Sequence, residues 1–367
     1  MLDRLRSALA ALLLAAVPAA TASAQDASAE GETAEPQYVL FTTTLGEILL
    51  ELDTENAPIT VDNFLQYVDS GHYDNTIFHR VMANFMIQGG GFDADFNERP
   101  TRDPIQNEWQ NGLRNIRGTI AMARTTGPDT ASSQFFINVR DNAVLDKARP
   151  QTGGAGYAVF GKVVAGLDTV DLIRLQPIGV RGPHRHAPTT DIVIQQATRV
   201  PNQEVEDAKT LVRSTNQRVR ERIAQAQIQQ AIDLLGEKGV SPNEVEQLPS
   251  GLLIADAVVG EGTKPIDNTA TVKVDYYGWF VDGREFDSSH KRGVPASFQL
   301  NKVVSGWTEG VGGMNVGGKR YLIVPPNLGY GSNGNPRAGI GPLDYLVFEV
   351  DLLAIPSNEV TITGEPQ

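Results

Sequence analysis

The sequence predicts two mainly β domains with some α-helix, joined by a helical connector. The 36 glycines and 21 prolines make up about 16% of the 367 residues, above an average of about 12%, which favours turn-rich β-structure. Val272, Val274 and Tyr276 alternate with polar residues, as strand residues do. Between the two β-rich regions, residues 202–238 lack proline and repeat apolar residues at three-, four- or seven-residue steps, which predicts an amphipathic helix. The two halves share no repeat, so two unlike domains are expected.

Composition and charge exclude several function classes. The net charge of −13 argues against binding to nucleic acid or to an anionic membrane surface. The absence of cysteine excludes disulfides, thiolate catalysis and cysteine-ligated metal centres. His184 and His186 lie in a stretch flanked by proline and glycine, and we interpret them as solvated loop residues rather than metal ligands. We therefore expect no metal and no cofactor.

The N-terminus has the pattern of an export signal. Arg4 and Arg6 precede an apolar run at 8–20, and the small residues 22–24 form an A-x-A cleavage site. About 13 apolar residues are too few to span a bilayer. The alternative is a buried N-terminal helix. The pattern predicts a signal peptide at 1–24, a flexible tether at 25–37 and an exported protein, periplasmic or, alternatively, secreted.

The first ordered region begins with local signals of strand and helix. Residues 38–52 predict two strands joined at Leu45-Gly46. Thr60 is expected to cap a helix that Gly71 ends. The apolar residues of this helix have the spacing of one buried face: Val61, Phe64, Leu65 and Val68.

Three motifs follow in order within this region. They are FHRVMANFMIQGG at 78–90, GTIAMAR at 118–124 and SSQFFI at 132–137. Together they resemble the cyclophilin family over a complete domain at 38–200. The resemblance implies a closed eight-stranded antiparallel barrel with two flanking helices, and peptidyl-prolyl cis/trans isomerase activity.

The chemistry of that activity explains the absence of a nucleophile. Rotation about an X-Pro bond has a barrier of roughly 18–20 kcal/mol, because amide resonance must be broken. A guanidinium can hydrogen-bond to the proline nitrogen as it becomes pyramidal, and thus favour the twisted amide. The resemblance assigns this role to Arg80, with Gln88 binding the substrate backbone and orienting Arg80.

The resemblance also assigns the remaining contacts of the first site. The apolar pocket for the proline ring would consist of Phe85, Met86, Phe136 and Leu145. The peptide groove would be lined by Gln134 and the backbone at Ala123 and Arg124. Arg124 and Tyr157 replace the Asn and His of many eukaryotic members. By spacing alone the apolar residues would be ordinary core and Arg80 a surface ion-pair partner.

A second set of motifs lies in the later β-rich region. It comprises YYG at 276–278, DGREFDSS at 282–289, VVSGWTEG at 303–310 and GYG at 329–331. These resemble the FKBP family over 248–356, leaving a tail at 357–367. The resemblance implies a bent antiparallel sheet wrapped on one short helix that begins near Trp307.

The implied second pocket is apolar and aromatic. Trp307 would be its floor, Tyr330 and the Val304 N–H would bind substrate carbonyls, and Asp287 would sit at the edge beside Arg292. A dry pocket penalises the more polar planar amide relative to the twisted one. Without the motifs these residues would read as a sheet core. The implied walls are Tyr276, Phe286, Val303, Val304, Ile340 and Phe348.

The connector at 201–247 loosely resembles the helical arms of exported bacterial FKBPs. Its apolar stripe must be buried, either in a homodimer through 202–238, on its own domains, or on client chains. Ser214-Thr215-Asn216 interrupts the stripe, and we expect it to break the helix.

The sequence as a whole predicts a prolyl isomerase with two unrelated catalytic domains. Its partners would be unfolded or partly folded proline-containing polypeptides, without nucleic acid and without membrane insertion. In the alternative hypothesis the protein is a chaperone whose second domain binds prolyl segments without useful turnover.

Overall fold

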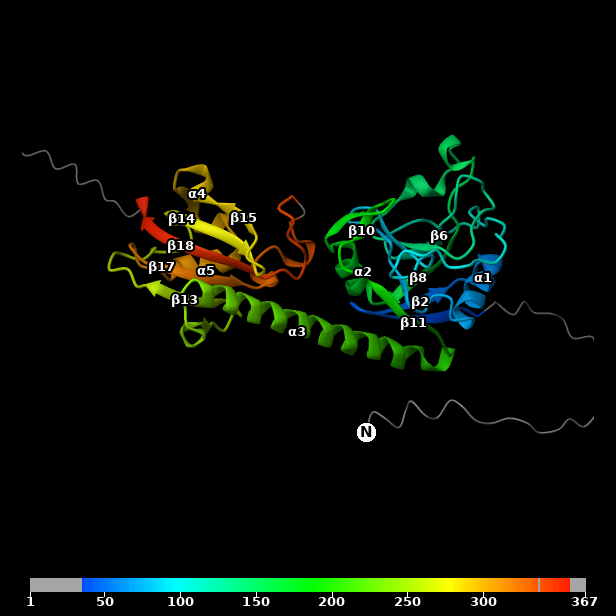
Figure 1. Ribbon diagram of the computed structural model, residues 1–367, viewed down its shortest axis with the longest axis horizontal. Helices are drawn as coiled ribbons and strands as arrows, with labels where there is room; N and C mark the ends of the chain where they lie inside the picture. The colour runs from blue at the N-terminus through cyan, green and yellow to red at the C-terminus, as the bar shows by residue number, and fades with distance from the viewer. Residues whose placement is uncertain (1–34, 336, 357–367) are drawn as a thin grey trace, which may run out of the picture. The chain divides into compact units, whose positions relative to one another are not determined.

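The computed structural model describes residues 35–335 and 337–356 (Figure 1). The described chain consists of antiparallel sheets and a long helix, α3 (Val205–Glu237), which confirms the predicted fold class. The predicted signal peptide at 1–24, most of the tether at 25–37 and the tail at 357–367 lie outside the described residues. No described helix is both long and apolar enough to cross a bilayer.

The first domain is built on a sheet that has nine strands among the described residues. Its order is β3-β11-β1-β2-β8-β6-β7-β5-β4. Thr43 pairs with Gly46 across the first turn, so the predicted hairpin forms. The strands are β1 (Gln37–Thr43), β2 (Gly46–Leu52), β3 (Thr76–Ile77), β4 (Arg80–Met82), β5 (Met86–Gly89), β6 (Thr119–Met122), β7 (Phe135–Asn138), β8 (Val159–Ala165) and β11 (Val193–Val200).

This sheet differs from the expected eight-stranded barrel by one interruption. β3 pairs with β11 at one end of the strand order, and β4 pairs with β5 at the other. Phe78 and His79 alone separate β3 from β4, and the Phe78 N–H donates to the Ile192 carbonyl at 3.0 Å. The two ends of the sheet are therefore halves of one chain segment, 76–82. The barrel closes through this segment. Because the segment counts as two strands, β3 and β4, the sheet has nine strands where eight were expected.

Side chains on the barrel strands alternate between two apolar clusters, because successive strand residues point to opposite faces. On β7, Phe135 and Ile137 belong to the barrel core, whereas Phe136 belongs to a second cluster with Met86 of β5 and Ala121 of β6. We call this second set the outer cluster. Its buried members are Met86, Ala121, Ala123, Phe136, Leu145 and Val159.

Two helices flank the barrel, α1 (Pro58–Asp69) and α2 (Leu167–Arg174). The expectation that Thr60 caps α1 is wrong, since the helix begins two residues earlier at Pro58. Proline suits the first helical position because its missing N–H would have no partner there. The Glu108 carboxylate instead accepts hydrogen bonds from the N–H groups of Ile59 and Thr60, at 3.1 and 2.8 Å. The predicted buried face is present, with Val61, Phe64, Leu65 and Val68 all buried.

A separate hairpin of β9 (Ile178–Arg181) and β10 (His184–Pro188) follows α2. The interpretation of His184 as a solvated loop residue is wrong. Its ring lies 4.9 Å from that of Phe92 and 4.8 Å from that of Phe96, centroid to centroid. Pairing of β9 with β10 holds this histidine against aromatic rings far away in the sequence.

Helix α3 is continuous, so the break expected at residues 214–216 is wrong. Asn216 is 2% exposed, and its side-chain amide pairs with the backbone of Glu47 in β2. Its Oδ1 accepts from the Glu47 N–H at 2.6 Å, and its Nδ2 donates to the Glu47 carbonyl at 3.0 Å. The polar residue thus satisfies backbone groups that would otherwise be buried without partners.

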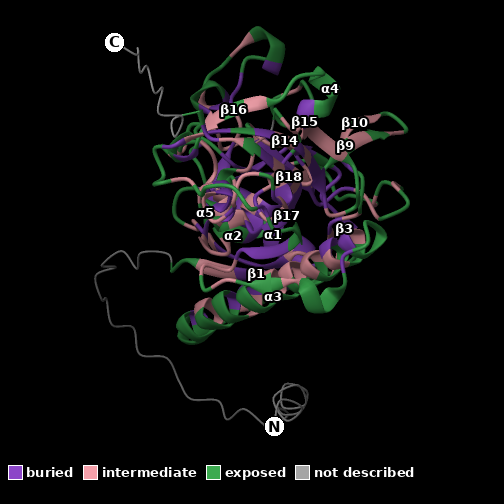
Figure 2. Cartoon of the chain, turned by 90° about the vertical axis from the view of Figure 1, so that its left-hand side faces the viewer, coloured by how far each residue is buried: buried purple, intermediate pink, exposed green. Residues whose placement is uncertain are grey.

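The apolar residues of α3 pack on the chain's own domains. Near the start of the helix, Val205 and Val212 contact Leu49 of β2. Near its end, Ala231 and Leu235 belong to a cluster of the second domain. Figure 2 shows most of α3 as exposed or intermediate, with few buried positions. Of the three alternatives for the stripe, the described residues show packing on the chain's own domains.

The second domain contains a sheet of seven strands among the described residues, in the order β12-β13-β17-β18-β14-β15 with β16 on β14. The short helix α5 (Ser305–Gly312) contains Trp307, as predicted. A further helical turn is α4 (Ser289–Arg292). The strands are β12 (Glu246–Gln247), β13 (Leu253–Val258), β14 (Thr271–Phe280), β15 (Glu285–Ser288), β16 (Ala296–Gln299), β17 (Lys319–Val324) and β18 (Leu346–Ala354).

The two faces of this sheet belong to different clusters. Val274 and Tyr276 of β14 lie in one cluster with Trp307 of α5. Trp279, on the opposite face of the same strand, lies in a second cluster with Leu235 of α3. Helix α3 therefore covers the face that is turned away from the implied pocket.

Loss of the Asn216 amide is expected to loosen β2. In Asn216→Leu, the N–H and carbonyl of Glu47 lose their partners in a buried position, which costs about 1–3 kcal/mol. Amide hydrogen exchange of β2 in the full chain measures this local opening free energy. The exposed neighbour gives the matched control, Gln217→Leu. Equal protection of Glu47 in both variants would contradict the assignment.

Candidate active sites

In the first domain, Arg80 is linked by hydrogen bonds to two glutamines. Arg80 and Gln88 are direct cross-strand partners on β4 and β5, and the Arg80 Nη1 donates to Gln88 Oε1 at 3.2 Å. Gln88 Nε2 in turn donates to Gln134 Oε1 at 2.9 Å. The Arg80 guanidinium is thereby oriented by a side chain that is itself oriented by a third residue.

Arg80 borders the outer cluster. Its Nη2 lies 3.3 Å from the sulfur of Met82, which packs against the outer cluster. Gln88 is the cross-strand partner of Phe136. The structure therefore brings the guanidinium to the edge of an apolar surface. Every apolar residue predicted for this pocket is in or against the outer cluster: Phe85, Met86, Phe136 and Leu145.

Beside this cluster, the Arg124 side chain links two backbone segments, a role that the sequence analysis did not predict. The guanidinium donates to backbone carbonyls of two segments, among them Ala155 at 2.7 Å and Thr125 at 3.0 Å. It also lies over the Tyr157 ring at 4.6 Å, and that ring is edge-on to Phe136 at 5.7 Å. The Ala123 N–H donates to the Gln134 carbonyl at 2.9 Å. One sequence signal could have indicated this contact. Arg124 and Tyr157 both differ from the Asn and His of many eukaryotic cyclophilins, and a joint change at two positions is expected of residues that touch.

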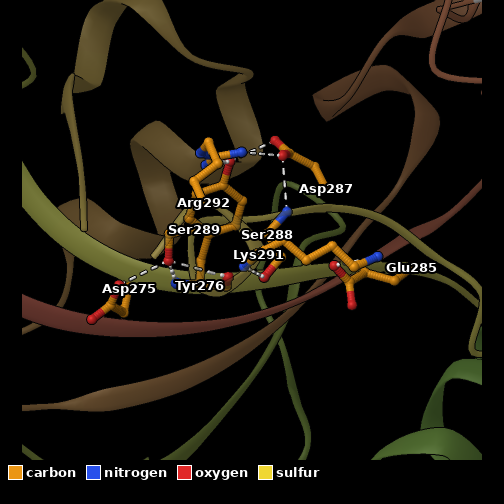
Figure 3. Close-up of polar contacts among 8 residues, drawn as sticks. All are labelled: Asp275, Tyr276, Glu285, Asp287, Ser288, Ser289, Lys291 and Arg292. Carbon is orange, nitrogen blue, oxygen red and sulfur yellow. Dashed lines mark hydrogen bonds and ion pairs between the residues drawn. The ribbon is translucent and has the colours of Figure 1, made fainter. Parts of the chain in front are cut away.

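In the second domain, the side chains of Tyr276, Asp287 and Arg292 converge (Figure 3). The Tyr276 hydroxyl donates to Asp287 Oδ2 at 2.5 Å. Arg292 donates to Asp287 Oδ1 at 2.5 Å and to the Tyr276 oxygen at 2.7 Å. The predicted pairing of Asp287 with Arg292 is therefore confirmed. Ser289 fixes the base of this group, accepting from the Tyr276 N–H at 2.9 Å and donating to Asp275 at 2.8 Å.

The protonation states follow from these contacts. Burial, followed by the hydrogen bond to Asp287, raises the pKa of Tyr276 to about 12. Burial opposes ionisation of Asp287, but hydrogen bonds from Tyr276 and Arg292 keep the pKa of this carboxyl below its ordinary value. At neutral pH the tyrosine is a neutral donor and the aspartate is an anion.

Trp307, the predicted pocket floor, is 4% exposed and lies in an apolar cluster with Tyr276 and Phe348. Its ring is edge-on to Tyr276 at 5.1 Å, Phe348 at 5.3 Å and Phe298 at 5.7 Å. Phe298 of β16 was not predicted, because nothing in its local sequence distinguishes it from a core residue. The indole N–H of Trp307 is buried without a hydrogen-bond partner among the described residues.

The other predicted wall residues divide by burial. Ile340 and Phe348 are buried in the Trp307 cluster, and Phe286, Val303 and Val304 pack against it half-buried. Tyr330 is 39% exposed, in the long connection between β17 and β18 that also carries Ile340. The structure thus gathers the predicted wall around Trp307 and leaves Tyr330 accessible.

Two family models match the chain. The cyclophilin type peptidyl-prolyl cis-trans isomerase/CLD family matches residues 38–199, and the FKBP-type peptidyl-prolyl cis-trans isomerase family matches 262–353. Peptidyl-prolyl cis-trans isomerase A of Dickeya dadantii is 52% identical over 160 residues, which is 44% of this chain and 83% of the relative. The FKBP-type isomerase FkpA of Escherichia coli is 44% identical over 119 residues, which is 32% of this chain and 43% of that relative. A crystal structure of E. coli FkpA aligns with a TM-score of 0.32 at 37% identity, covering 42% of this chain and 73% of that chain.

His79, adjacent to Arg80, is expected to make folding stability depend on pH. It is 3% exposed, and burial, followed by the charges of His184 and Arg80, lowers its pKa to about 4. Between about pH 6.5 and 4 the unfolded chain binds a proton here that the folded chain does not. The free energy of unfolding therefore falls as the pH falls through this window, by at most about 3 kcal/mol.

The variant His79→Phe removes this contribution. The free energy of unfolding of the variant and of the parent is measured in urea at pH 7 and pH 4.5. The parent is expected to lose more of this free energy than the variant does between pH 7 and pH 4.5. His186→Phe serves as the matched histidine control. Parallel pH dependences of the parent and His79→Phe would contradict the prediction.

Proposed function

Because this chain belongs to the cyclophilin-type peptidyl-prolyl cis-trans isomerases and carries an FKBP-type isomerase domain behind the first, we propose how each of its two pockets catalyses the reaction. The observation that carries the proposal for the first domain is the Arg80–Gln88–Gln134 hydrogen-bond chain at the edge of the outer cluster. The proposed domain boundaries are 38–200, 201–247 and 248–356, supported by the two matched ranges.

In the first domain, Arg80 is the proposed catalytic residue. Twisting of the C–N bond localises a lone pair on the proline nitrogen, and a permanently charged guanidinium stabilises that state more than the planar amide. Gln88 accepts a hydrogen bond from Arg80 and so holds the guanidinium in place before substrate arrives. Gln134 and the backbone of Ala123 and Arg124 would bind the substrate chain. The proline ring would be held by Phe85, Met86, Phe136 and Leu145.

In the second domain, the proposed driving force is the dryness of the aromatic pocket. A planar amide has a larger dipole than a twisted one, so transfer from water into apolar surroundings disfavours the planar form relatively more. The neutral Tyr276 hydroxyl and the Asp287 anion would supply the polar edge, and the exposed Tyr330 is the proposed donor to a substrate carbonyl. The Val304 N–H is the second proposed donor. The proposed wall and floor are Tyr276, Phe286, Val303, Val304, Trp307, Ile340 and Phe348.

The proposed setting is outside the cytoplasm. The basic start, apolar run and small residues of 1–24 support export, to the periplasm in a double-membraned cell. Substrates would be unfolded or partly folded proline-containing polypeptides, because slow prolyl isomerisation limits folding. A homodimer through 202–238 would use the part of α3 that its own domains leave exposed, including Leu211.

Replacing Arg80 is expected to inactivate the first domain. In the full chain, Arg80→Ala should lower the first domain's contribution to kcat/KM on an X-Pro peptide on the order of 10²–10³-fold, so that the total activity falls to that of the second domain. Gln88→Leu should lower it less, because the guanidinium remains but is no longer oriented. Protease-coupled or NMR exchange assays measure the rates, and the exposed Arg140→Ala is a matched control. Full activity of Arg80→Ala in the first domain would refute the assignment.

The Tyr276 hydroxyl is expected to support activity of the second domain. In a chain already carrying Arg80→Ala, Tyr276→Phe removes the hydrogen bond to Asp287 but keeps the ring. We expect kcat/KM to fall on the order of fivefold. Tyr277→Phe, on the opposite face of the same strand, should have no such effect. If the Arg80→Ala parent shows no isomerisation but still suppresses aggregation of an unfolded protein, the second domain is a binding module.

A further inference from the structure

We propose that Gln227 of α3 is a positioning residue for the second pocket, because it fixes the segment that carries Ile340 into that pocket. The inference rests on the proposed function of the pocket. It assigns part of the connector to the support of the second domain's proposed site.

The side-chain amide of Gln227 makes two hydrogen bonds to one short backbone segment. Its Nε2 donates to the Leu343 carbonyl at 2.8 Å, and its Oε1 accepts from the Tyr345 N–H at 2.9 Å. These two backbone groups immediately precede β18. The amide thus satisfies a donor and an acceptor at the point where the connection from β17 joins the sheet.

This segment leads directly to the pocket wall. Ile340 is 2% exposed and belongs to the same cluster as Trp307. On its N-terminal side, Ile340 exchanges two backbone hydrogen bonds with Asn335, at 2.8 and 3.0 Å. On its C-terminal side, the Gly341 N–H donates to the Asp344 carboxylate at 2.6 Å, and Gln227 holds the residues beyond. The backbone is therefore held on both sides of Ile340, and α3 holds it on the C-terminal side.

Apolar packing reinforces the same attachment. Tyr345 packs against a cluster that contains Ala231 and Leu235 of α3, with Ile228 and Ile232 at its edge. Helix α3 therefore contacts both the backbone of this segment and the side chain of Tyr345. A shift of α3 would move the segment with it, because the close packing between them leaves no room for independent movement.

Gln227 makes the same kind of contact as Asn216, a side-chain amide paired with backbone groups of another segment. Gln227 follows Asn216 by eleven residues, or about three helical turns, so the two amides lie on one face of α3. Asn216 pairs with the N–H and carbonyl of Glu47, and Gln227 pairs with the N–H and carbonyl of the segment at 343–345. Both polar residues interrupt the apolar stripe at positions where a backbone needs partners.

The experiment uses the full chain carrying Arg80→Ala, so that isomerisation of an X-Pro peptide reports on the second domain. Gln227→Glu keeps the length and an acceptor of the side chain but loses the donor to Leu343. Gln227→Met removes both hydrogen bonds. Gln225→Glu, at an exposed position two residues away, introduces the same charge and is the matched control.

We expect KM to rise on the order of fivefold in Gln227→Glu, more in Gln227→Met, and not in Gln225→Glu, with kcat little changed. Thermal unfolding shows whether each variant is folded. If Gln227→Met does not fold, amide exchange of Ile340 in Gln227→Glu decides: faster exchange supports the proposal, and unchanged exchange overturns it. Equal KM values in folded variants and parent also overturn it.

An inactive Arg80→Ala parent would instead refute turnover by the second domain. In that case, affinity for the same peptide, followed by tryptophan fluorescence, replaces the rate. Weaker binding by Gln227→Glu than by Gln225→Glu supports the positioning role, and equal binding overturns it. Failure of the proposed function and failure of this inference are thus separate results.

Discussion

Both domains depend on the two-residue alternation of side chains along antiparallel strands. In the barrel it assigns Phe135 to the core and Phe136 to the outer cluster, and in the second domain it assigns Tyr276 to the Trp307 cluster and Trp279 to the face covered by α3. A register slip of one residue would exchange core and pocket residues along the affected strand. In the barrel the candidate site lies on the face opposite the core, whereas in the second domain Tyr276 and Trp307 belong to the main apolar cluster.

The two pockets address the same barrier by different physical means. In the proposal for the first domain, Arg80 places a permanent positive charge where a lone pair would develop, and Gln88 orients its guanidinium. In the proposal for the second domain, the buried ring of Trp307 would form the floor of the pocket, and the ion pair of Asp287 with Arg292 would lie at its edge. Charge stabilisation acts on the twisted state, whereas desolvation acts on the planar one.

Polar side chains that are buried or half-buried connect parts of the chain that are distant in sequence. Asn216 and Gln227 satisfy backbone groups far away in the sequence, and Arg124 binds carbonyls from two separate segments. Each is a polar residue that would be unfavourable in its place without those partners. Such residues interrupt a local pattern, and the interruption at 214–216 was interpreted as a helix break because its partner in β2 is invisible locally.

The sequence by itself determined the β1–β2 hairpin, the buried face of α1, the position of α5 and the sets of apolar residues gathered around Phe136 and Trp307. The hairpin and the helix face follow from local spacing and turn signals, whereas the position of α5 and the two apolar sets follow from motifs that resemble known families, because spacing alone would indicate ordinary core. The tertiary structure alone decided that the barrel closes through the strand split at 78–79, that α3 is continuous, and that His184 packs among aromatic rings. These outcomes depend on hydrogen-bond and packing partners that are distant in sequence, whose positions no local pattern specifies.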